Sequence, residues 1–300
     1  MTMPNFLVIG AAKAGTTSLY HYLRQHPQIF MSPHKEPRFF ALEGQALDFK
    51  GPGDMTRFNF CTNIKAYQSL FDGVTHEKAI GEVSPWYLYV PQSAKRIKQH
   101  VPNAKLIAIL RDPVNRAYSN YLHAVREQLE PLDDFELAME AEAERIKQNW
   151  SYRWHYKQKG FYFAQIRRYL DNFDRQQIRF YLFEDFKSDP TAMLRDVFSF
   201  LDVDENFPAD VSEKFNVAGL PKVKLLDDVL TRRDTFTPLI GKLIPSRKIR
   251  QSVKNALKKF NTRPKPELSP SVRLRYIEEY REDILKVQDL LQRDLSKWLH

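Results

Sequence analysis

Residues 10–17 have the types and spacing of a phosphate-binding loop. The segment Gly10-Ala-Ala-Lys13-Ala-Gly15-Thr16-Thr17 follows a short aliphatic run at residues 6–9 and precedes a helical pattern at residues 18–25. The first N–H groups of a helix have no partner within the helix, and the helix dipole favours negative charge at that end. We therefore expect the backbone of this loop, together with Lys13, to bind an anion.

This loop differs from the nucleoside triphosphate loop G-x-x-x-x-G-K-[ST] at a position that matters for the chemistry. Thr16 stands where that loop has its lysine, and Lys13 lies two residues before the second glycine. A second aliphatic run, residues 106–110, ends in Arg111 and not in the aspartate that holds magnesium in nucleotide hydrolases. The residues predict a phosphate site that uses cations and hydroxyls and requires no metal; a purely structural turn is the alternative.

Arg111 and Ser119 form a second candidate anion site. Arg111 follows a predicted strand and precedes a predicted helix, which is where ligands bind in open α/β sheets. Ser119 lies eight residues later, about two helical turns on, so that both side chains could share one anion. The alternative for Arg111 is an ordinary surface ion pair.

Predicted strands and helices alternate through the first 200 residues. Aliphatic runs predict strands at residues 6–9, 79–83, 105–110 and 178–183, and helical spacing follows at residues 114–127, 162–173 and 191–201. Strands as apolar as these are typical of a parallel sheet covered on both faces. The predicted fold class is therefore α/β, with a central parallel sheet flanked by helices.

The last third of the chain does not continue the alternation of strands and helices. Residues 204–223 have the composition of a loop, and a final helix is predicted at about residues 271–299, docked on the domain by one apolar stripe. The stripe consists of Leu274, Ile277, Ile284, Val287, Leu290, Leu291, Leu295 and Trp298.

Composition excludes several classes of protein. With 43% hydrophobic residues in 300, the chain is too apolar for a disordered protein. A single cysteine, Cys61, excludes an intrachain disulfide and a thiolate zinc cluster, and it favours a reducing compartment. Neither a signal peptide nor a membrane-spanning run is evident. We expect a cytoplasmic protein, with peripheral attachment to a membrane as a variant.

The net charge of +9 is concentrated in one stretch. Residues 242–265 contain nine Lys and Arg and no acid, and residues 246–260 have the pattern of a basic amphipathic helix. Such a helix can bind an anionic membrane surface or an acidic partner such as an acyl carrier protein, or guide a polyanionic glycan. The alternative is a packed helix with a solvated basic face. Nucleic acid is not predicted, since only Phe260 interleaves with the cations.

Four motifs together resemble the sulfotransferases that use 3′-phosphoadenosine 5′-phosphosulfate (PAPS). They are Lys13-Ala-Gly-Thr-Thr-Ser18, Lys35-Glu36-Pro-Arg-Phe-Phe40, Gly81-Glu-Val-Ser-Pro85 and Arg111-Asp-Pro-Val-Asn-Arg-Ala-Tyr-Ser119. The heparan sulfate N- and 3-O-sulfotransferases and their bacterial relatives are the most similar branch. The resemblance implies a P-loop-like, nucleotide-kinase-like fold. It also implies one sulfotransferase domain over residues 1–300, with a basic helical insertion at about 225–265.

The resemblance also implies roles for individual residues. PAPS would be the donor and 3′-phosphoadenosine 5′-phosphate (PAP) the product, with no metal required. Glu36 would be the general base, Lys13 would stabilise the leaving phosphate, and His123 would be an active-site histidine. The remaining donor-binding residues would be Ala14, Gly15, Thr16, Thr17 and Ser18 at the 5′-phosphosulfate, Arg111 and Ser119 at the 3′-phosphate, and Lys222 in a late loop that closes over the nucleotide.

The acceptor is the open question at this stage. Relatives often have K-E-x-H-F-F around the base, and Arg38 replaces that histidine here, which bears on acceptor identity. Candidate acceptor contacts are Lys35, Arg38, Glu82 and Ser84, and a saccharide, a small metabolite, a lipid or a carrier-bound acyl chain would each fit, through a hydroxyl or an amine. His34 is a rival base. A P-loop kinase or NTPase, and a non-catalytic protein that binds membranes or polyanions, remain the alternatives.

Overall fold

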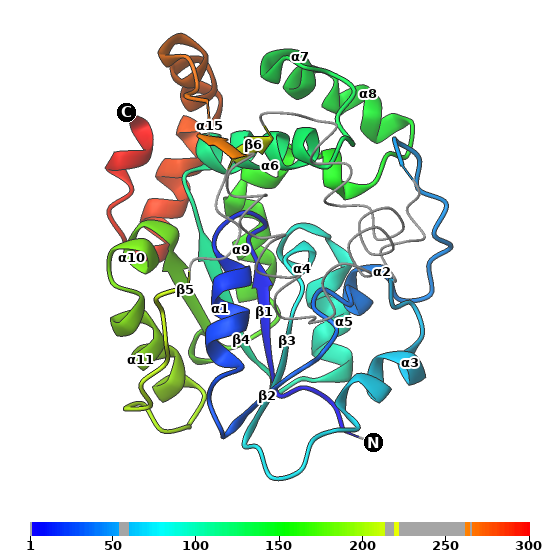
Figure 1. Ribbon diagram of the computed structural model, residues 1–300, viewed down its shortest axis with the longest axis vertical. Helices are drawn as coiled ribbons and strands as arrows, with labels where there is room; N and C mark the ends of the chain where they lie inside the picture. The colour runs from blue at the N-terminus through cyan, green and yellow to red at the C-terminus, as the bar shows by residue number, and fades with distance from the viewer. Residues whose placement is uncertain (1, 54–59, 214–218, 222–261, 265) are drawn as a thin grey trace, which may run out of the picture.

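A computed structural model describes residues 2–53, 60–213, 219–221, 262–264 and 266–300. Its central sheet has five strands in the order β2-β3-β1-β4-β5 within these ranges, and every pairing is parallel (Figure 1). The strands are β1 (Phe6–Gly10), β2 (Ile29–Met31), β3 (Ala79–Val83), β4 (Lys105–Leu110) and β5 (Ile178–Leu182). The predicted parallel sheet is confirmed; the short edge strand β2 was not predicted from the sequence.

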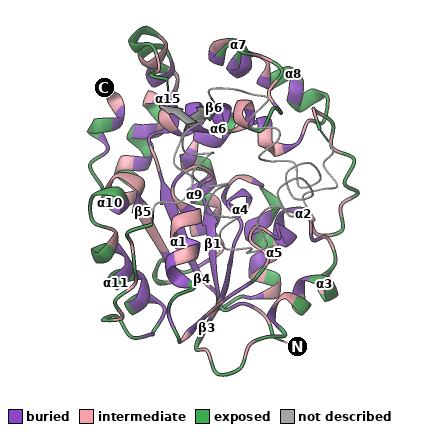
Figure 2. Cartoon of the chain, in the orientation of Figure 1, coloured by how far each residue is buried: buried purple, intermediate pink, exposed green. Residues whose placement is uncertain are grey.

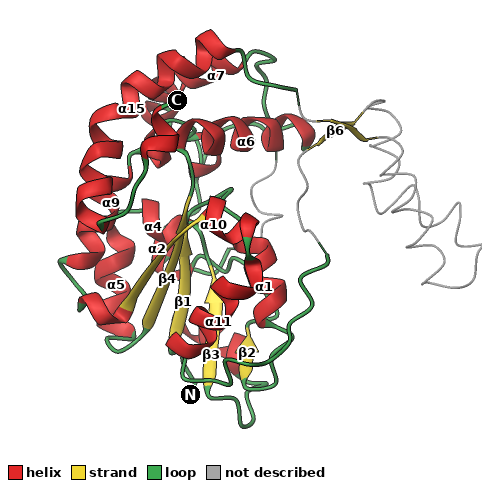
Figure 3. Ribbon diagram, turned by 90° about the vertical axis from the view of Figure 1, so that its left-hand side faces the viewer, coloured by secondary structure: helices red, strands yellow, loops and turns green. Residues whose placement is uncertain are grey.

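Helices cover both faces of the sheet, as Figure 3 shows. One face carries α1 and α11, and the other carries α5 and α9, while α6 crosses above the carboxyl ends of the strands. The helices are α1 (Thr16–Leu23), α2 (Phe39–Leu42), α3 (Ile64–Gln68), α4 (Trp86–Tyr89), α5 (Gln92–His100), α6 (Pro113–Arg126), α7 (Phe135–Glu140), α8 (Glu142–Lys147), α9 (Tyr162–Leu170), α10 (Phe183–Ser188), α11 (Pro190–Phe200) and α15 (Pro270–Leu291).

Strand order explains where a ligand can enter. The chain leaves β1 toward β2 on one side of the sheet and leaves β4 toward β5 on the other, although β1 and β4 are neighbours. Every residue of β1 is buried, and so is nearly all of β4 (Figure 2). The two connections diverge above the carboxyl ends of β1 and β4, and such a divergence opens a crevice in doubly wound sheets.

The C-terminal helix is shorter than predicted. It ends at Leu291 because Gln292 adopts a left-handed backbone with φ 53°, and a separate 3₁₀ turn, Ser296–Leu299, follows. The predicted helix at 271–299 is therefore wrong in its last two turns. Leu274 is 56% exposed and does not belong to the buried stripe. Aromatic residues that the prediction omitted complete the docking face, which consists of Tyr276, Ile277, Tyr280, Ile284 and Val287.

Two short strands lie on either side of residues 222–261, which include most of the basic stretch. Strand β6 (Gly219–Pro221) pairs antiparallel with β7 (Thr262–Pro264), with Pro221 opposite Thr262. Part of the predicted loop at 204–223 is therefore a strand. The predicted basic helix at 246–260 and Lys222 lie outside the described residues, and the insertion at about 225–265 stays a prediction. No helix within the described ranges is both long enough and apolar enough to cross a membrane.

Candidate active site

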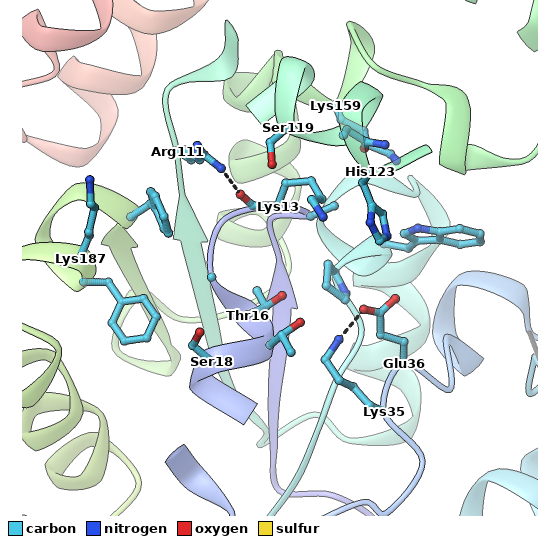
Figure 4. A pocket seen from close by; sticks show the side chains of 18 of the residues that line it. Lys13, Thr16, Ser18, Lys35, Glu36, Arg111, Ser119, His123, Lys159 and Lys187 are labelled. Atoms are coloured by element: carbon cyan, nitrogen blue, oxygen red, sulfur yellow. Dashed lines mark hydrogen bonds and ion pairs between the residues drawn. The ribbon is translucent and has the colours of Figure 1, made fainter. Parts of the chain in front are cut away.

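A cavity of about 590 Å³ opens at the carboxyl edge of the sheet (Figure 4). Its walls come from the loop after β1, the loop before α2, the turn after β3 and the residues after β4. Helix α6 and helix α10 complete the enclosure. The lining includes the predicted residues Lys13, Gly15, Thr16, Thr17, Ser18, Lys35, Glu36, Arg38, Arg111, Ser119 and His123. Segments more than 100 residues apart in the sequence thus meet at one site.

The loop after β1 has the geometry of an anion site. Gly15 caps helix α1 with a left-handed backbone at φ 89°, and the ring of Phe186 lies 3.0 Å from where a Cβ would stand. Glycine alone suits both constraints. Lys13 also has a positive φ, of 71°, a conformation that costs free energy and clusters at functional sites. The loop is thereby held with the first turn of α1 facing the cavity.

The side chain of Lys13 is partly buried in the cavity wall, and its surroundings disfavour its positive charge. Burial, with the charges of Arg126 and Arg111, lowers the pKa of Lys13 to about 8, although Glu36 and Glu127 oppose the shift. A bound anion would reverse this shift, since it favours the charged ammonium. Lys13 therefore has the properties of a cation that binds phosphate.

Arg111 connects the two candidate anion sites. Its guanidinium donates a hydrogen bond of 2.8 Å to the carbonyl oxygen of Lys13 (Figure 4). The same group packs 4.5 Å from the centroid of the Phe183 ring. Burial lowers the pKa of the Arg111 side chain, and the Glu184 charge opposes this. Ser119 lines the same cavity from α6. The structure thus brings Arg111 and Ser119 together with the loop, as the sequence predicts.

Glu36 is held between two cations. Lys35 Nζ lies 2.5 Å from its Oε1, and Arg38 Nη2 lies 2.5 Å from its Oε2. The backbone N–H of Glu36 donates to the carbonyl of Val83 at the end of β3, and the residue has φ 62°. Burial raises the pKa of the carboxyl, but the two adjacent cations outweigh burial and hold the pKa far below its ordinary range. Glu36 is therefore ionised, with both oxygens occupied.

Glu82 and Ser84 lie behind the cavity wall and not on it. Ser84 Oγ donates to Glu82 Oε2 (2.9 Å) and accepts the backbone N–H of Arg38 (3.0 Å), while Tyr67 donates to Glu82 Oε1. Burial raises the pKa of the Glu82 carboxyl to about 7. Both residues are fully buried. From the sequence we expected both residues to contact the acceptor, but neither lines the cavity. Their hydrogen bonds instead hold the backbone that positions Arg38.

His123 is fixed by its own helix. Arg126 donates to His123 Nδ1 over 2.8 Å, so Nδ1 is an acceptor and the neutral ring carries its proton on Nε2, which lies 3.3 Å from Glu127 Oε1. Burial and the nearby charges of Lys13 and Arg126 lower the pKa of His123 well below its ordinary range. His123 therefore lines the site as a neutral ring, and its basic nitrogen is already bonded.

Other cavity residues were missed from the sequence. Trp86 lines the cavity beneath the predicted residue Arg38, whose Cζ lies 4.2 Å from its ring centroid, and this stacking has no sequence signature. Arg153 and Lys159 reach the cavity from short 3₁₀ turns; the only signal for Lys159 is its place beside Gly160. The others are Ala12, Tyr22, Pro85, Asn120, Phe183, Phe186, Lys187, Pro190 and Val211. Across the described segments, no three His, Cys, Asp or Glu side chains gather as a metal site.

Comparisons with known proteins give a consistent result. A model described as the sulfotransferase family matches residues 4–207. The crystal structure of a sulfotransferase from Alicyclobacillus acidocaldarius is similar over 100% of both chains, with a TM-score of 0.79 and 34% identity. A membrane-associated sulfotransferase of Dictyostelium discoideum is 35% identical over 155 residues, which are 49% of this chain and 30% of that protein.

Two further relatives match more of the chain. The bifunctional heparan sulfate N-deacetylase/N-sulfotransferase 4 of Mus musculus is 30% identical over 213 residues, 68% of this chain and 23% of the mouse protein. Carbohydrate sulfotransferase 15 of Homo sapiens is 27% identical over 252 residues, 67% of this chain and 44% of the human protein. The chain thus spans less than half the length of each of these curated relatives.

Proposed function

This chain belongs to the sulfotransferase family, and we propose that it transfers the sulfuryl group of PAPS to a hydroxyl or amine of an acceptor. One observation carries the proposal. The hydrogen bond from Arg111 to the Lys13 carbonyl joins two anion sites in one cavity, and a carboxylate, Glu36, lines the same cavity. A nucleotide with separate 5′ and 3′ phosphates, next to an acceptor that must lose a proton, fits this arrangement.

The donor would occupy the side of the cavity formed by α1 and α10. The loop of residues 13–18 would hold the 5′-phosphosulfate, and Arg111 with Ser119 would hold the 3′-phosphate. Phe183 and Phe186 line the same side, and their rings would stack on the adenine. We propose that Lys222 closes over the nucleotide and that PAP is the product.

The reaction would be an in-line displacement at sulfur. The bond from the acceptor oxygen or nitrogen to sulfur forms as the bond from sulfur to the 5′-phosphate oxygen breaks, and the acceptor proton passes to Glu36. Lys13 and the N–H groups of Gly15, Thr16 and Thr17 would stabilise the charge that develops on the leaving phosphate. Preorganised donors of this kind act where charge develops in the transition state.

Glu36 can act as a base only after its ion pairs loosen. A carboxylate whose pKa is held far below the working pH takes up a proton poorly. The sulfuryl group of the donor would offer Lys35 a second anion, which weakens the Lys35–Glu36 pair and raises the pKa of Glu36. His123, whose Nε2–H lies against Glu127 Oε1 at 3.3 Å, would donate a hydrogen bond to the acceptor by exchanging this partner and would not replace the base.

The acceptor side would be formed by Lys35, Arg38 and Trp86. We propose a saccharide or small metabolite as the acceptor, because relatives that share two thirds of this chain are named for carbohydrate and heparan sulfate sulfation. A lipid or carrier-bound acyl chain is the variant if residues 246–260 bind a membrane or an acidic partner. We place the protein in the cytoplasm on its cysteine usage.

A direct test measures transfer of radiolabelled sulfate from PAPS to a panel of saccharide, lipid and carrier-bound acceptors, with PAP binding measured by calorimetry in the presence of a chelator. We expect PAP to bind without magnesium. Binding of ATP that depends on magnesium, with no binding of PAP, would instead support a kinase or NTPase. Two residues argue against a kinase or NTPase. Thr16 stands where the triphosphate loop has its lysine, and Arg111 stands where nucleotide hydrolases have the aspartate that holds magnesium.

A further inference from the structure

The cavity contains a buried lysine that the proposed reaction does not use. Lys159 is 4% exposed and lines the cavity from the 3₁₀ turn Gln158–Gly160. In Figure 4 it lies on the His123 side of the view, opposite Lys187. Its ammonium has no hydrogen bond or ion pair to any residue that the structure describes. Lys13 also lines the cavity without such a partner among the described residues, but it is only partly buried and faces the place proposed for the donor phosphate.

The acid whose charge acts on Lys159 is Glu142, and its carboxylate is already occupied. It accepts the backbone N–H groups of Lys157 (2.5 Å) and Gln158 (2.8 Å). Arg153, whose charge also acts on Lys159, pairs with Glu127 at 2.6 Å. Nothing in these contacts supplies a counter-ion to the Lys159 ammonium.

The surroundings of Lys159 make its positive charge unfavourable. Burial, together with the charges of Arg116, Arg153 and Arg38, lowers its pKa well below the ordinary value, against the opposing charge of Glu142. The backbone cannot easily turn the side chain away, because Gln165 Nε2 donates to the Lys159 carbonyl and Gly160 packs on the ring of Tyr280. A buried cation in this setting is stabilised by an anion that enters from outside.

We infer that Lys159, assisted by Arg153, binds an oxyanion substituent of the acceptor, so that the enzyme prefers an acceptor carrying a carboxylate or sulfate group. This inference rests on the proposed function, because it assigns the donor's two phosphate positions to Lys13 and to Arg111 with Ser119. Lys159 would then be a specificity residue: it holds the acceptor by a group other than the one that receives sulfate.

The test uses the full chain saturated with PAP and titrates it with three small probes. Glucuronate carries a carboxylate, glucose 6-sulfate carries a sulfate, and the methyl ester of glucuronic acid is neutral. Calorimetry compares the wild type with Lys159→Met and with the control Lys157→Met, whose lysine pairs with Glu279 outside the cavity. A charge-assisted hydrogen bond of this kind corresponds to roughly ten- to hundred-fold in affinity.

We expect Lys159→Met to lose about ten-fold or more in affinity for one or both anionic probes. Its affinity for the neutral ester and for PAP should not change, and Lys157→Met should bind every ligand as the wild type does. The probe that loses more identifies carboxylate or sulfate. We also expect the melting temperature of Lys159→Met to be unchanged or higher, which excludes a purely structural lysine. Equal binding of the anions by both proteins, or a loss of PAP affinity in Lys159→Met alone, would overturn the inference. Failure of the wild type to bind PAP would overturn the proposed function itself.

Discussion

The chemistry of this site depends on charges that are only partly compensated. Glu36 has a cation on each carboxylate oxygen, while Lys13 has no such partner among the described residues. On the roles proposed above, the base Glu36 is thus suppressed and Lys13 loses its proton more readily than an ordinary lysine. Binding of the proposed anionic donor would change both in the useful direction, because it would attract Lys35 away from Glu36 and favour the protonated form of Lys13.

Replacement of the proposed base should remove most of the activity. We expect Glu36→Gln to lower kcat by about 10² to 10⁴, the usual contribution of a general base, while PAP affinity changes little. Radiolabelled sulfate transfer measures the first quantity and calorimetry the second. Glu43→Gln is the matched control, since Glu43 pairs with His100 outside the cavity. Full activity in Glu36→Gln would assign the base elsewhere, with His34 the first alternative.

The affinity for PAP should depend on pH through Lys13. The pKa of Lys13 in the free protein is about 8, so its ammonium is present below that pH and is lost as the pH rises through it. We expect PAP affinity to be constant below about pH 7 and to fall as the pH rises from 7 to 9. Lys13→Ala should bind PAP more weakly and lack this fall. Calorimetric titrations across that range test it, and parallel profiles for both proteins would contradict it.

Glu82 should make the protein less stable as the pH rises. Its folded-state pKa, about 7, is above the ordinary value for glutamate, so the folded state binds more protons than the unfolded state between about pH 4.5 and 7. Stability attributable to this group is therefore full below that window and lost across it, up to about 3 kcal/mol. Urea denaturation of Glu82→Gln should show a smaller decline over the same window. An unchanged decline would mean that other groups cause it.

At the scale of elements, the start of α6 determines where Ser119 and His123 lie. Asp112 caps this helix by accepting the N–H of Asn115 (2.9 Å), and it also pairs with Arg273 of α15 at 2.7 Å. Pro113 occupies the first position of the helix, where its missing N–H has no cost. The C-terminal helix is thereby connected to the wall of the active site through one buried carboxylate.

Loss of this connection should reduce stability. We expect Asp112→Ala to cost about 2 to 3 kcal/mol in unfolding free energy, since it removes a helix cap and leaves Arg273 with only its hydrogen bonds to the His300 carbonyl. Arg273→Ala should lower the unfolding free energy by less than Asp112→Ala does. The double variant should lower it by less than the sum of the two single effects. Urea denaturation measures this cycle. Arg281→Ala, which removes an exposed pair with Glu278, should change stability by under about 0.5 kcal/mol. Additive effects would show that Asp112 and Arg273 are not coupled.

The parts of the site that could be predicted from the sequence are those set by local order. A loop between a strand and a helix places Lys13, and the end of a strand places Arg111, whatever the rest of the chain does. Lys159 could not be predicted, because its turn reaches the cavity only through packing against α6, α9 and α15. Glu82 was expected to contact the acceptor but lies behind the cavity wall. Both faces of β3 are largely buried, so the spacing of residues along the strand does not indicate which face meets the cavity.

On the scale of the whole molecule, the excess charge and the candidate active site come from different parts of the sequence. The net charge of +9 equals that of residues 242–265, whereas Lys13, Arg111 and Lys159 lie far from this stretch in sequence. Strands β6 and β7 pair with each other on either side of residues 222–261, with Pro221 opposite Thr262. The chain therefore leaves the described fold and returns to it at one place, which makes the intervening residues removable without a long bridge.

Removal of the basic stretch should separate catalysis from delivery of the acceptor. We would replace residues 226–260 with Asn-Gly, a dipeptide that favours tight turns between antiparallel strands, and retain Lys222. The removed residues include nine Lys and Arg and three Asp. We expect unchanged PAP affinity and unchanged transfer to small acceptors, with binding to phosphatidylserine vesicles lost, because electrostatic attraction to an anionic surface requires clustered cations. Cosedimentation at low and high salt measures the vesicle binding. A shortened protein that no longer binds PAP would instead assign these residues to the donor site, and one that still binds vesicles would place the membrane contact on the described fold.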